Sequence, residues 1–234
     1  MKPWVSLAAS PAPDGTVLEL CQRGHEYVIR AGGRILMGSH RPGSERAMAE
    51  LTLDALPNER KVAANVLVGG LGCGFTLRAT LDQLGAEARV TVSELLPAVV
   101  EWNRGPMGEC SGLPVGDNRV QVVIGDIKQL LLRERQTFDA IMLDVDNGPQ
   151  AFTQQSNAWL YSKCGLDASR RALRSRGVLS VWSAGPNEAF STRLRAAGFD
   201  IRCHTVRSSN ARRGERHTVW VAVKETRVDF DESA

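Results

Sequence analysis

One stretch of the chain decides the fold, and it reads Asn65-Val66-Leu67-Val68-Gly69-Gly70-Leu71-Gly72-Cys73-Gly74. The apolar residues before the glycines are typical of a buried strand, and a helix with leucines on one face is expected directly after them, over residues 75–84. A glycine-rich turn between a strand and a helix lets the backbone approach a ligand, because unpaired N–H groups and the helix dipole meet there. The stretch therefore predicts a nucleotide-binding βαβ unit.

The spacing of the glycines narrows the choice of ligand. Dinucleotide-binding folds carry a GxGxxG pattern, whereas this chain has Gly70-x-Gly72-x-Gly74. The shorter spacing favours an adenosyl-sulfonium cofactor over NAD, and we expect Gly70, Leu71, Gly72 and Gly74 to line it. A glycine turn that serves only tight packing is the alternative.

Strands and helices alternate along most of the chain. Strands are expected at residues 65–68, 89–93, 120–124, 139–143, 177–182, 199–206 and 217–223, and helices are expected to begin near Ser44, Phe75, Pro97, Ile127, Leu166 and Asn187. Repeated strand-helix units predict a mostly parallel sheet with helices on both faces. A polar loop joins the last two strands, so they should form an antiparallel hairpin at the edge. The fold class is α/β, with a Rossmann-like seven-stranded sheet.

A small antiparallel β unit is expected before this domain. Short β-type runs at residues 17–20, 26–30 and 35–37 are separated by Arg23-Gly24 and Gly32-Gly33, which are turn sequences. We therefore divide the chain into a β appendage over residues 1–43 and a cofactor-binding catalytic domain over residues 44–234.

Acids follow the next two strands. Glu94 comes about 20 residues after the glycines, where a carboxylate accepts hydrogen bonds from both ribose hydroxyls. A surface acid beside a helix start is the alternative. Asp126 is expected to accept a hydrogen bond from the adenine amine or to cap the helix from Ile127, since Asp is a good capping residue. We expect Glu94 with Leu95, and Asp126 with Ile127, to contact the cofactor.

The fourth strand carries the catalytic candidates. Ile141-Met142-Leu143 runs into Asp144-Val145-Asp146-Asn147-Gly148-Pro149 at the edge where open α/β sheets bind ligands. Two carboxylates beside a sulfonium can hold a cationic amine, and one of them can orient or deprotonate the attacking nitrogen. Asp144 and Asp146 are therefore the predicted catalytic residues. A turn stabilised by Asx hydrogen bonds and a rigid Gly-Pro pair is the alternative.

Composition limits the other function classes. The 234 residues are 43% apolar and 24% charged with a net charge of +3, which is ordinary for a globular protein and too small to indicate a nucleic-acid partner. The five cysteines are scattered and the four histidines show no ligand spacing, so we expect no disulfide framework and no metal. No apolar run approaches the roughly 20 residues that span a bilayer. We expect a cytoplasmic protein without a membrane segment.

With these residues in place, the chain from about Met37 to Val223 resembles the spermidine/spermine synthase-like family. Residues 66–72 look like the cofactor loop of that family, and residues 91–101 look like its ribose-binding segment. Residues 117–126 resemble the segment that leads to the family's adenine-binding acid, and residues 138–144 resemble its catalytic strand. Leu160-Tyr161 and the small β unit also fit. The resemblance implies aminopropyl transfer from decarboxylated S-adenosylmethionine to a polyamine amine, with release of 5′-methylthioadenosine.

The chain departs from the family's pattern at three places. Cys73 stands where the family typically has an acid that holds the aminopropyl amine. The family's catalytic acids usually lie three apart, whereas Asp144 and Asp146 are two apart. Near the N-terminus only His40 and Glu45 approach the usual Tyr-His-Glu substrate motif. Two alternatives therefore stay open, an S-adenosylmethionine-dependent methyltransferase and a non-catalytic nucleoside-binding homologue.

A small cationic amine is the expected second substrate. Glu45, Tyr161 and Trp182 are the candidates to line its pocket, although lone aromatic residues more often belong to a core. In the methyltransferase alternative, the arginines late in the chain would favour an anionic or nucleic-acid acceptor. The edge hairpin and the β unit offer surfaces for a homodimer, but the sequence specifies no interface.

Overall fold

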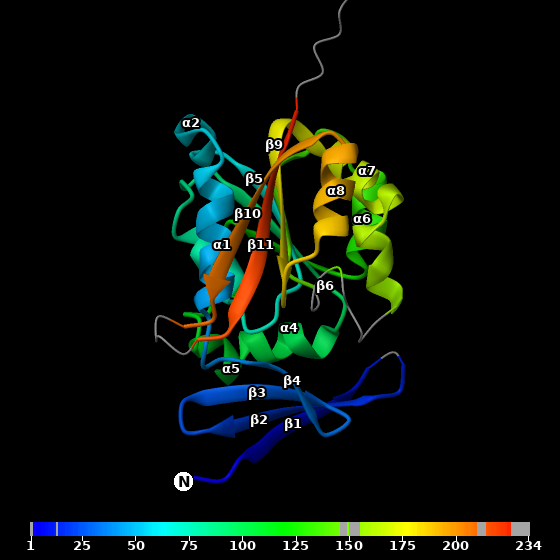
Figure 1. Ribbon diagram of the computed structural model, residues 1–234. Helices are drawn as coiled ribbons and strands as arrows, with labels where there is room; N and C mark the ends of the chain where they lie inside the picture. Colours follow the sequence, from blue (N-terminus) through cyan, green and yellow to red (C-terminus); the bar gives the residue numbers. More distant parts are fainter. Residues whose placement is uncertain (1, 13, 146–148, 150–154, 210–213, 226–234) are drawn as a thin grey trace, which may run out of the picture.

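Two β-sheets organise the computed structural model, which describes residues 2–12, 14–145, 149, 155–209 and 214–225 (Figure 1). The larger sheet has seven strands in the order β10-β11-β9-β8-β5-β6-β7. Strands β5 to β9 run parallel, and β11 pairs antiparallel with both β9 and β10. This confirms the expected sheet and its C-terminal hairpin. The strands are β5 (Asn65–Gly69), β6 (Arg89–Glu94), β7 (Val120–Ile124), β8 (Phe138–Leu143), β9 (Leu173–Ser183), β10 (Phe199–Arg207) and β11 (Arg216–Lys224).

Helices cover this sheet on both faces. One apolar cluster joins α1, α3 and α4 to one face, with Met48 and Leu77 almost inaccessible to water. A second cluster joins α6, α7 and α8 to the other face through Leu131, Leu166 and Leu194. Burial of each such side chain contributes about 1.5–3 kcal/mol. The helices are α1 (Gly43–Asp54), α2 (Asn58–Lys61), α3 (Phe75–Leu81), α4 (Pro97–Arg104), α5 (Pro106–Glu109), α6 (Ile127–Arg133), α7 (Lys163–Ala172) and α8 (Glu188–Ala196), with 3-10 turns at Pro114–Gly116 and Gln155–Tyr161.

The smaller sheet is antiparallel and lies beside the carboxyl ends of the parallel strands (Figure 1). It consists of β1 (Val5–Pro11), β2 (Val17–Arg23), β3 (Glu26–Ala31) and β4 (Arg34–Gly38). Leu20 and Ile29 belong to the same apolar cluster as α1 and α3, so the β unit packs directly on the main domain. The domain boundary near residue 43 stays a prediction, although α1 begins there.

Strand β9 begins four residues earlier than the sequence suggests. Leu173 already pairs with Phe138 of β8, and the next residue, Arg174, donates a 2.7 Å hydrogen bond to the buried carboxylate of Asp139. Asp139 also accepts from the backbone N–H of Asn65 at 2.9 Å. This carboxylate therefore ties β5, β8 and β9 together at their amino ends, away from the glycine turn.

Candidate active site

Glycine is required at two positions of the loop between β5 and α3, residues 70–74. Gly70 has a φ of +86°, and a Cβ there would overlap the carbonyl oxygen of Asp144. Gly74 has a φ of +83°, and its Cβ would lie 2.8 Å from the hydroxyl oxygen of Ser111. Side chains are strained at such φ values. The backbone of the loop therefore runs close beside Asp144.

Glu94 at the end of β6 faces this loop. Its Oε2 accepts from the N–H of Leu71 at 2.9 Å and its Oε1 accepts from the N–H of Leu96 at 2.9 Å. Burial raises the pKa of Glu94, whereas hydrogen bonds from the surrounding backbone N–H groups favour the charged form and partly oppose this shift. Each carboxylate oxygen can accept a second hydrogen bond, so ribose hydroxyls remain compatible with these contacts. Leu95 beside it is 42% exposed.

The second predicted cofactor pair, Asp126 and Ile127, lies at the start of helix α6. The Asp126 carboxylate accepts from the N–H of Lys128 at 2.8 Å, which is the capping role that the sequence left open. Asp126 is exposed, and its contact with adenine stays a prediction. The side chain of Ile127 is buried against Gly69, so only its backbone is placed to meet a ligand.

Asp144 directly follows β8 and lies against the first turn of α3. The hydroxyl of Thr76 donates to its Oδ2 at 2.6 Å. Burial raises the pKa of Asp144 to about 7, and the negative charge of Glu45 adds to this shift, while the Thr76 hydrogen bond opposes it. A carboxyl group with such a pKa can exchange a proton near neutral pH. Asp146, the second predicted catalytic acid, lies outside the described residues.

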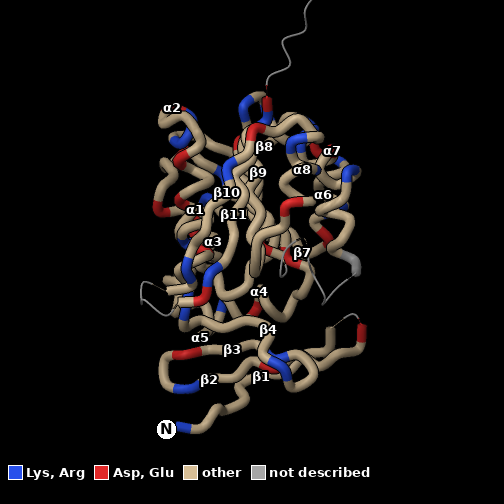
Figure 2. Tube along the Cα trace, viewed as in Figure 1, with Lys and Arg blue, Asp and Glu red and all other residues tan. Residues whose placement is uncertain are grey.

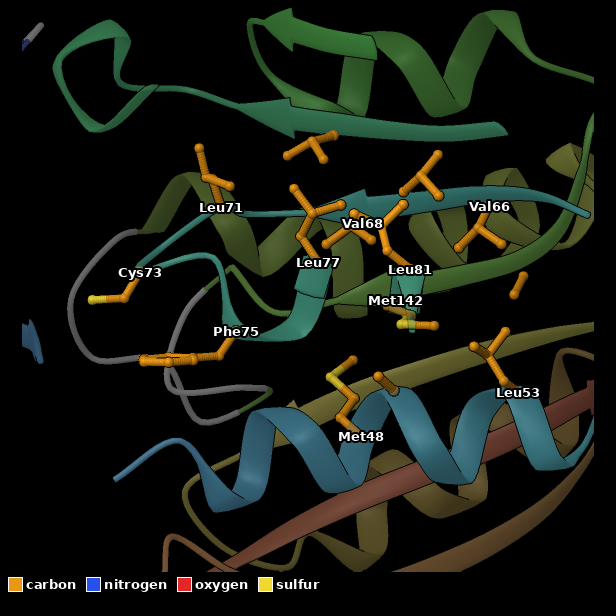
Figure 3. Packing of buried hydrophobic residues seen from close by; sticks show 14 of the residues in the cluster. Met48, Leu53, Val66, Val68, Leu71, Cys73, Phe75, Leu77, Leu81 and Met142 are labelled. Atoms are coloured by element: carbon orange, nitrogen blue, oxygen red, sulfur yellow. The ribbon is translucent and has the colours of Figure 1, made fainter. Parts of the chain in front are cut away.

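Helix α1 brings the charge of Glu45 close enough to Asp144 to raise the pKa of that carboxyl group. The hydroxyl of Ser44 donates to Glu45 Oε2 at 2.6 Å, and the guanidinium of Arg46 lies 5.9 Å from the ring centre of Phe75, at the start of α3. In Figure 3, Phe75 lies between Cys73 of the glycine loop and helix α1. The structure thus sets Glu45 across from the loop that precedes α3.

The amino end of α1 is anchored to the distant hairpin. The N–H of Gly43 donates to the carbonyl oxygen of Ser208 at 2.8 Å. A Cβ at Gly43 would lie only 2.6 Å from the carbonyl oxygen of Arg207. Only glycine allows this approach, so the anchor fixes where the first turn of α1, with Glu45, meets the sheet.

Trp182 and His217 lie on the α1 side of the sheet, on neighbouring strands β9 and β11. Their ring centres are 4.8 Å apart and the rings are tilted by 33°. Burial lowers the pKa of His217, whereas the charges of Glu215 and Glu45 oppose that shift. Glu45 thus acts electrostatically on both Asp144 and His217, which groups these side chains at one end of the sheet. Sequence reasoning missed His217 and Thr76; the position of Thr76 in the first turn after the glycines was the available signal.

Tyr161 is not in this group. It is buried in the cluster on the other face of the sheet, where its ring meets that of Phe190 edge-on at 5.8 Å. Trp182 packs instead against the cluster of α1 and α3. That Glu45, Tyr161 and Trp182 line the pocket of the second substrate stays a prediction.

The charged residues of the main domain are not segregated by sign. Figure 2 shows positively and negatively charged residues interspersed along the trace of the main domain. Arg170 donates to the carbonyl oxygens of Gly198 and Glu225, so part of the late arginine cluster has a structural role. No three His, Cys, Asp or Glu side chains in the described part of the chain are grouped to hold a metal ion. Within that same part, no helix has the length and apolar character needed to cross a membrane.

The sheet order and the position of the glycine turn are those of the Rossmann-type α/β proteins, which bind nucleosides at the carboxyl ends of their strands. Sequence comparison places the chain within one branch of that class. The model of the spermine/spermidine synthase domain matches residues 43–192, and the chain therefore belongs to the spermine/spermidine synthase family.

Curated relatives and solved structures agree with this family. The chain is 34% identical over 125 residues to polyamine aminopropyltransferase 1 of Streptomyces coelicolor, covering 53% of this chain and 23% of that protein. It is 31% identical over 135 residues to the polyamine aminopropyltransferase of Korarchaeum cryptofilum, covering 57% of this chain and 38% of that protein. The chain thus matches well under half the length of these relatives.

The fold is also that of solved spermidine synthases. The enzyme from Thermotoga maritima superposes with a TM-score of 0.73 at 18% identity, over 94% of this chain and 72% of that one. A spermidine synthase in complex with the transition state analogue AdoDATO gives a TM-score of 0.72 at 18% identity, with the same coverage.

Proposed function

We propose that this protein transfers an aminopropyl group from decarboxylated S-adenosylmethionine to an amine of a small polyamine. The observation that carries the proposal is the carboxyl group of Asp144, held at the carboxyl end of β8 beside the glycine loop with its pKa raised to about 7. Membership of the spermine/spermidine synthase family supports the same reaction.

In this reaction the acceptor nitrogen attacks the aminopropyl carbon next to the sulfonium. A C–N bond forms as the C–S bond breaks, the sulfur keeps the bonding electrons, and 5′-methylthioadenosine leaves. The attacking amine must lose one proton, and Asp144 is the group that takes it. The in-line geometry depends on positioning, which we assign to the glycine loop and Glu94 on the nucleoside side.

The acceptor amine is proposed to lie between Asp144 and Glu45. The charge of Glu45 acts on Asp144, and a cation between the two carboxyl groups would relieve the repulsion that helps to raise the pKa of Asp144. Trp182 offers an aromatic wall on the same side of the sheet. Asp146 is proposed as a further anionic group.

The direct test incubates the purified protein with decarboxylated S-adenosylmethionine and putrescine and measures released 5′-methylthioadenosine. We expect release with the wild type and at least a hundredfold less with Asp144→Asn, since general-base catalysis contributes about 10²–10⁴ in rate. Asp54→Asn, at an exposed acid of α1, is the matched control and should keep the wild-type rate. Absence of release with every common diamine would refute the proposal.

A methyltransferase on the same fold is the second candidate, and Cys73 favours it. This residue replaces the family's usual acid for the aminopropyl amine, and burial raises the pKa of its thiol, so it supplies no negative charge. Calorimetry with S-adenosylmethionine and its decarboxylated form distinguishes the two, because tighter binding of the carboxylated form would favour methyl transfer. Binding of either nucleoside without turnover would instead indicate a non-catalytic homologue.

We further propose a cytoplasmic location and a homodimer. All five cysteines are free thiols, which fits a reducing compartment. Val5 of β1 and Ile35 of β4 are 55% and 60% exposed, so the small sheet offers apolar surface for a second copy. Light scattering of the purified protein tests the dimer, and a monomer at micromolar concentration would refute it.

A further inference from the structure

The side chain of Asn103 contacts the glycine loop from helix α4. It is completely buried, and its Nδ2 donates hydrogen bonds to the carbonyl oxygens of Gly72 at 2.8 Å and Val99 at 2.9 Å. These two acceptors fix the orientation of the amide, because the reversed amide would set oxygen against oxygen. The bond to Val99 stays within the helix, whereas the bond to Gly72 reaches across to the loop.

The oxygen of the same amide lies against Gly74. A Cβ at Gly74 would be 3.0 Å from Asn103 Oδ1. Oδ1 is buried and accepts no hydrogen bond from the described residues. A buried polar atom without a partner lowers the stability of the folded state, and an apolar side chain at this position would avoid that loss. The contact that only the amide can make is the hydrogen bond to the carbonyl oxygen of Gly72.

That bond sets the direction of the next backbone N–H. The peptide bond between Gly72 and Cys73 is trans, so the carbonyl of Gly72 and the N–H of Cys73 point in opposite directions. Because Asn103 draws this carbonyl toward α4, the N–H of Cys73 points away from α4. No described residue accepts a hydrogen bond from that N–H.

Glu94 holds the same turn one residue earlier. Its Oε2 accepts from the N–H of Leu71 at 2.9 Å, while Asn103 donates to the carbonyl of Gly72. Glu94 ends β6 and Asn103 lies on α4, the helix that follows it. A single strand-helix segment therefore grips residues 71–72 at one backbone donor and one backbone acceptor, which leaves little freedom in the loop.

We propose that Asn103 is a positioning residue of the cofactor site, which holds the glycine loop so that the N–H of Cys73 is presented to the bound adenosyl ligand. The inference rests on the proposed function for the identity of that ligand. Asn103 touches no reacting atom and acts entirely through the loop backbone.

Two variants separate the hydrogen bond from simple packing. Asn103→Ala removes the donor and leaves space, whereas Asn103→Leu removes the donor and fills that space. Thr52→Val is the matched control, because Thr52 is also fully buried and its hydroxyl bonds Met48 and Ser180 instead of the loop. Affinity for 5′-methylthioadenosine is measured by calorimetry, and backbone freedom by hydrogen exchange of the amides at residues 71–74.

We expect both Asn103 variants to weaken 5′-methylthioadenosine binding about tenfold, the effect of one buried hydrogen bond, and to speed exchange at residues 71–74 but not at 66–68. Thr52→Val should change neither. Wild-type behaviour of Asn103→Leu would overturn the role of the donor. If the wild type binds no nucleoside, the proposed function fails separately, and unchanged exchange in both variants would still overturn the positioning role.

Discussion

Asp144 should make the stability of this protein depend on pH in a way that Asp144→Asn removes. The fold raises the pKa of Asp144 from 3.8 to about 7, so between these values the folded state keeps a proton that the unfolded chain releases. Stability from this group is therefore present below about pH 4 and is lost as pH rises through 7. Asparagine has nearly the same shape, can still accept from Thr76, and does not ionise.

The size of the effect follows from the shift. Each pH unit between the two pKa values costs about 1.4 kcal/mol, so the two units from pH 5 to pH 7 amount to about 3 kcal/mol. The carboxyl group of Asp144 is buried, but the residue as a whole keeps some exposure to water, and we therefore expect the wild type to lose about 2 kcal/mol relative to Asp144→Asn over this range. At pH 8 the variant should be the more stable protein although it is the less active one.

Urea unfolding at pH 5, 6, 7 and 8 measures this difference. Asp54→Asn, an exposed acid on α1, serves as the control and should follow the wild type at every pH. Parallel stability curves for wild type and Asp144→Asn would refute the reasoning, because they would mean that Asp144 ionises alike in the folded and unfolded chain. The turnover of the wild type should rise with an inflection near pH 7 if the same group is the base.

Three further substitutions test other parts of the site and its support. Glu94→Gln sets an amide N–H₂ against the N–H of Leu71 or of Leu96, so we expect at least tenfold weaker nucleoside binding by calorimetry; unchanged binding would contradict the ribose role. Gly74→Ala should lower the free energy of unfolding by about 2 kcal/mol or more, measured with urea, because residue 74 has a left-handed φ. An unchanged free energy of unfolding would show that the loop relaxes to accept the side chain. Asp139→Ala should lower stability by about 2–3 kcal/mol without changing KM, and an altered KM would show that this distant carboxylate influences the site.

The parts of the fold that follow local patterns were predictable from sequence. β7 and the start of α6 agree with prediction because apolar spacing and the Asp126 cap are local signals. β1 was missed, since its small and polar residues lack a clear apolar alternation and the strand forms only by pairing with β2. The first residues of β9 were missed for a similar reason, because Leu173 and Arg174 are held by partners on β8 that sequence does not reveal.

The candidate site likewise contains residues that the sequence could predict and residues that it could not. Glu94 and Asp144 follow strand ends, so their approach to the glycine turn could be deduced from the order of strands and helices. Asn103 could not, because a polar residue within a helix is usually exposed and nothing local indicates a bond to Gly72. The face of the sheet on which Tyr161 packs could not be deduced either, since which side of a sheet a helix covers depends on the crossover and not on the aromatic residue itself.

The bond between Gly43 and Ser208 has a consequence for the order in which the chain can fold. The two residues are 165 positions apart in the sequence, so the first turn of α1, with Glu45, is anchored only after Ser208 has been synthesised. Chains fold from the N-terminus as they emerge, so the loop around Gly70 and Glu94 can fold on a nascent chain in which α1 still lacks this anchor. A chain released before Ser208 would therefore keep the glycine loop but leave Glu45 without a fixed position.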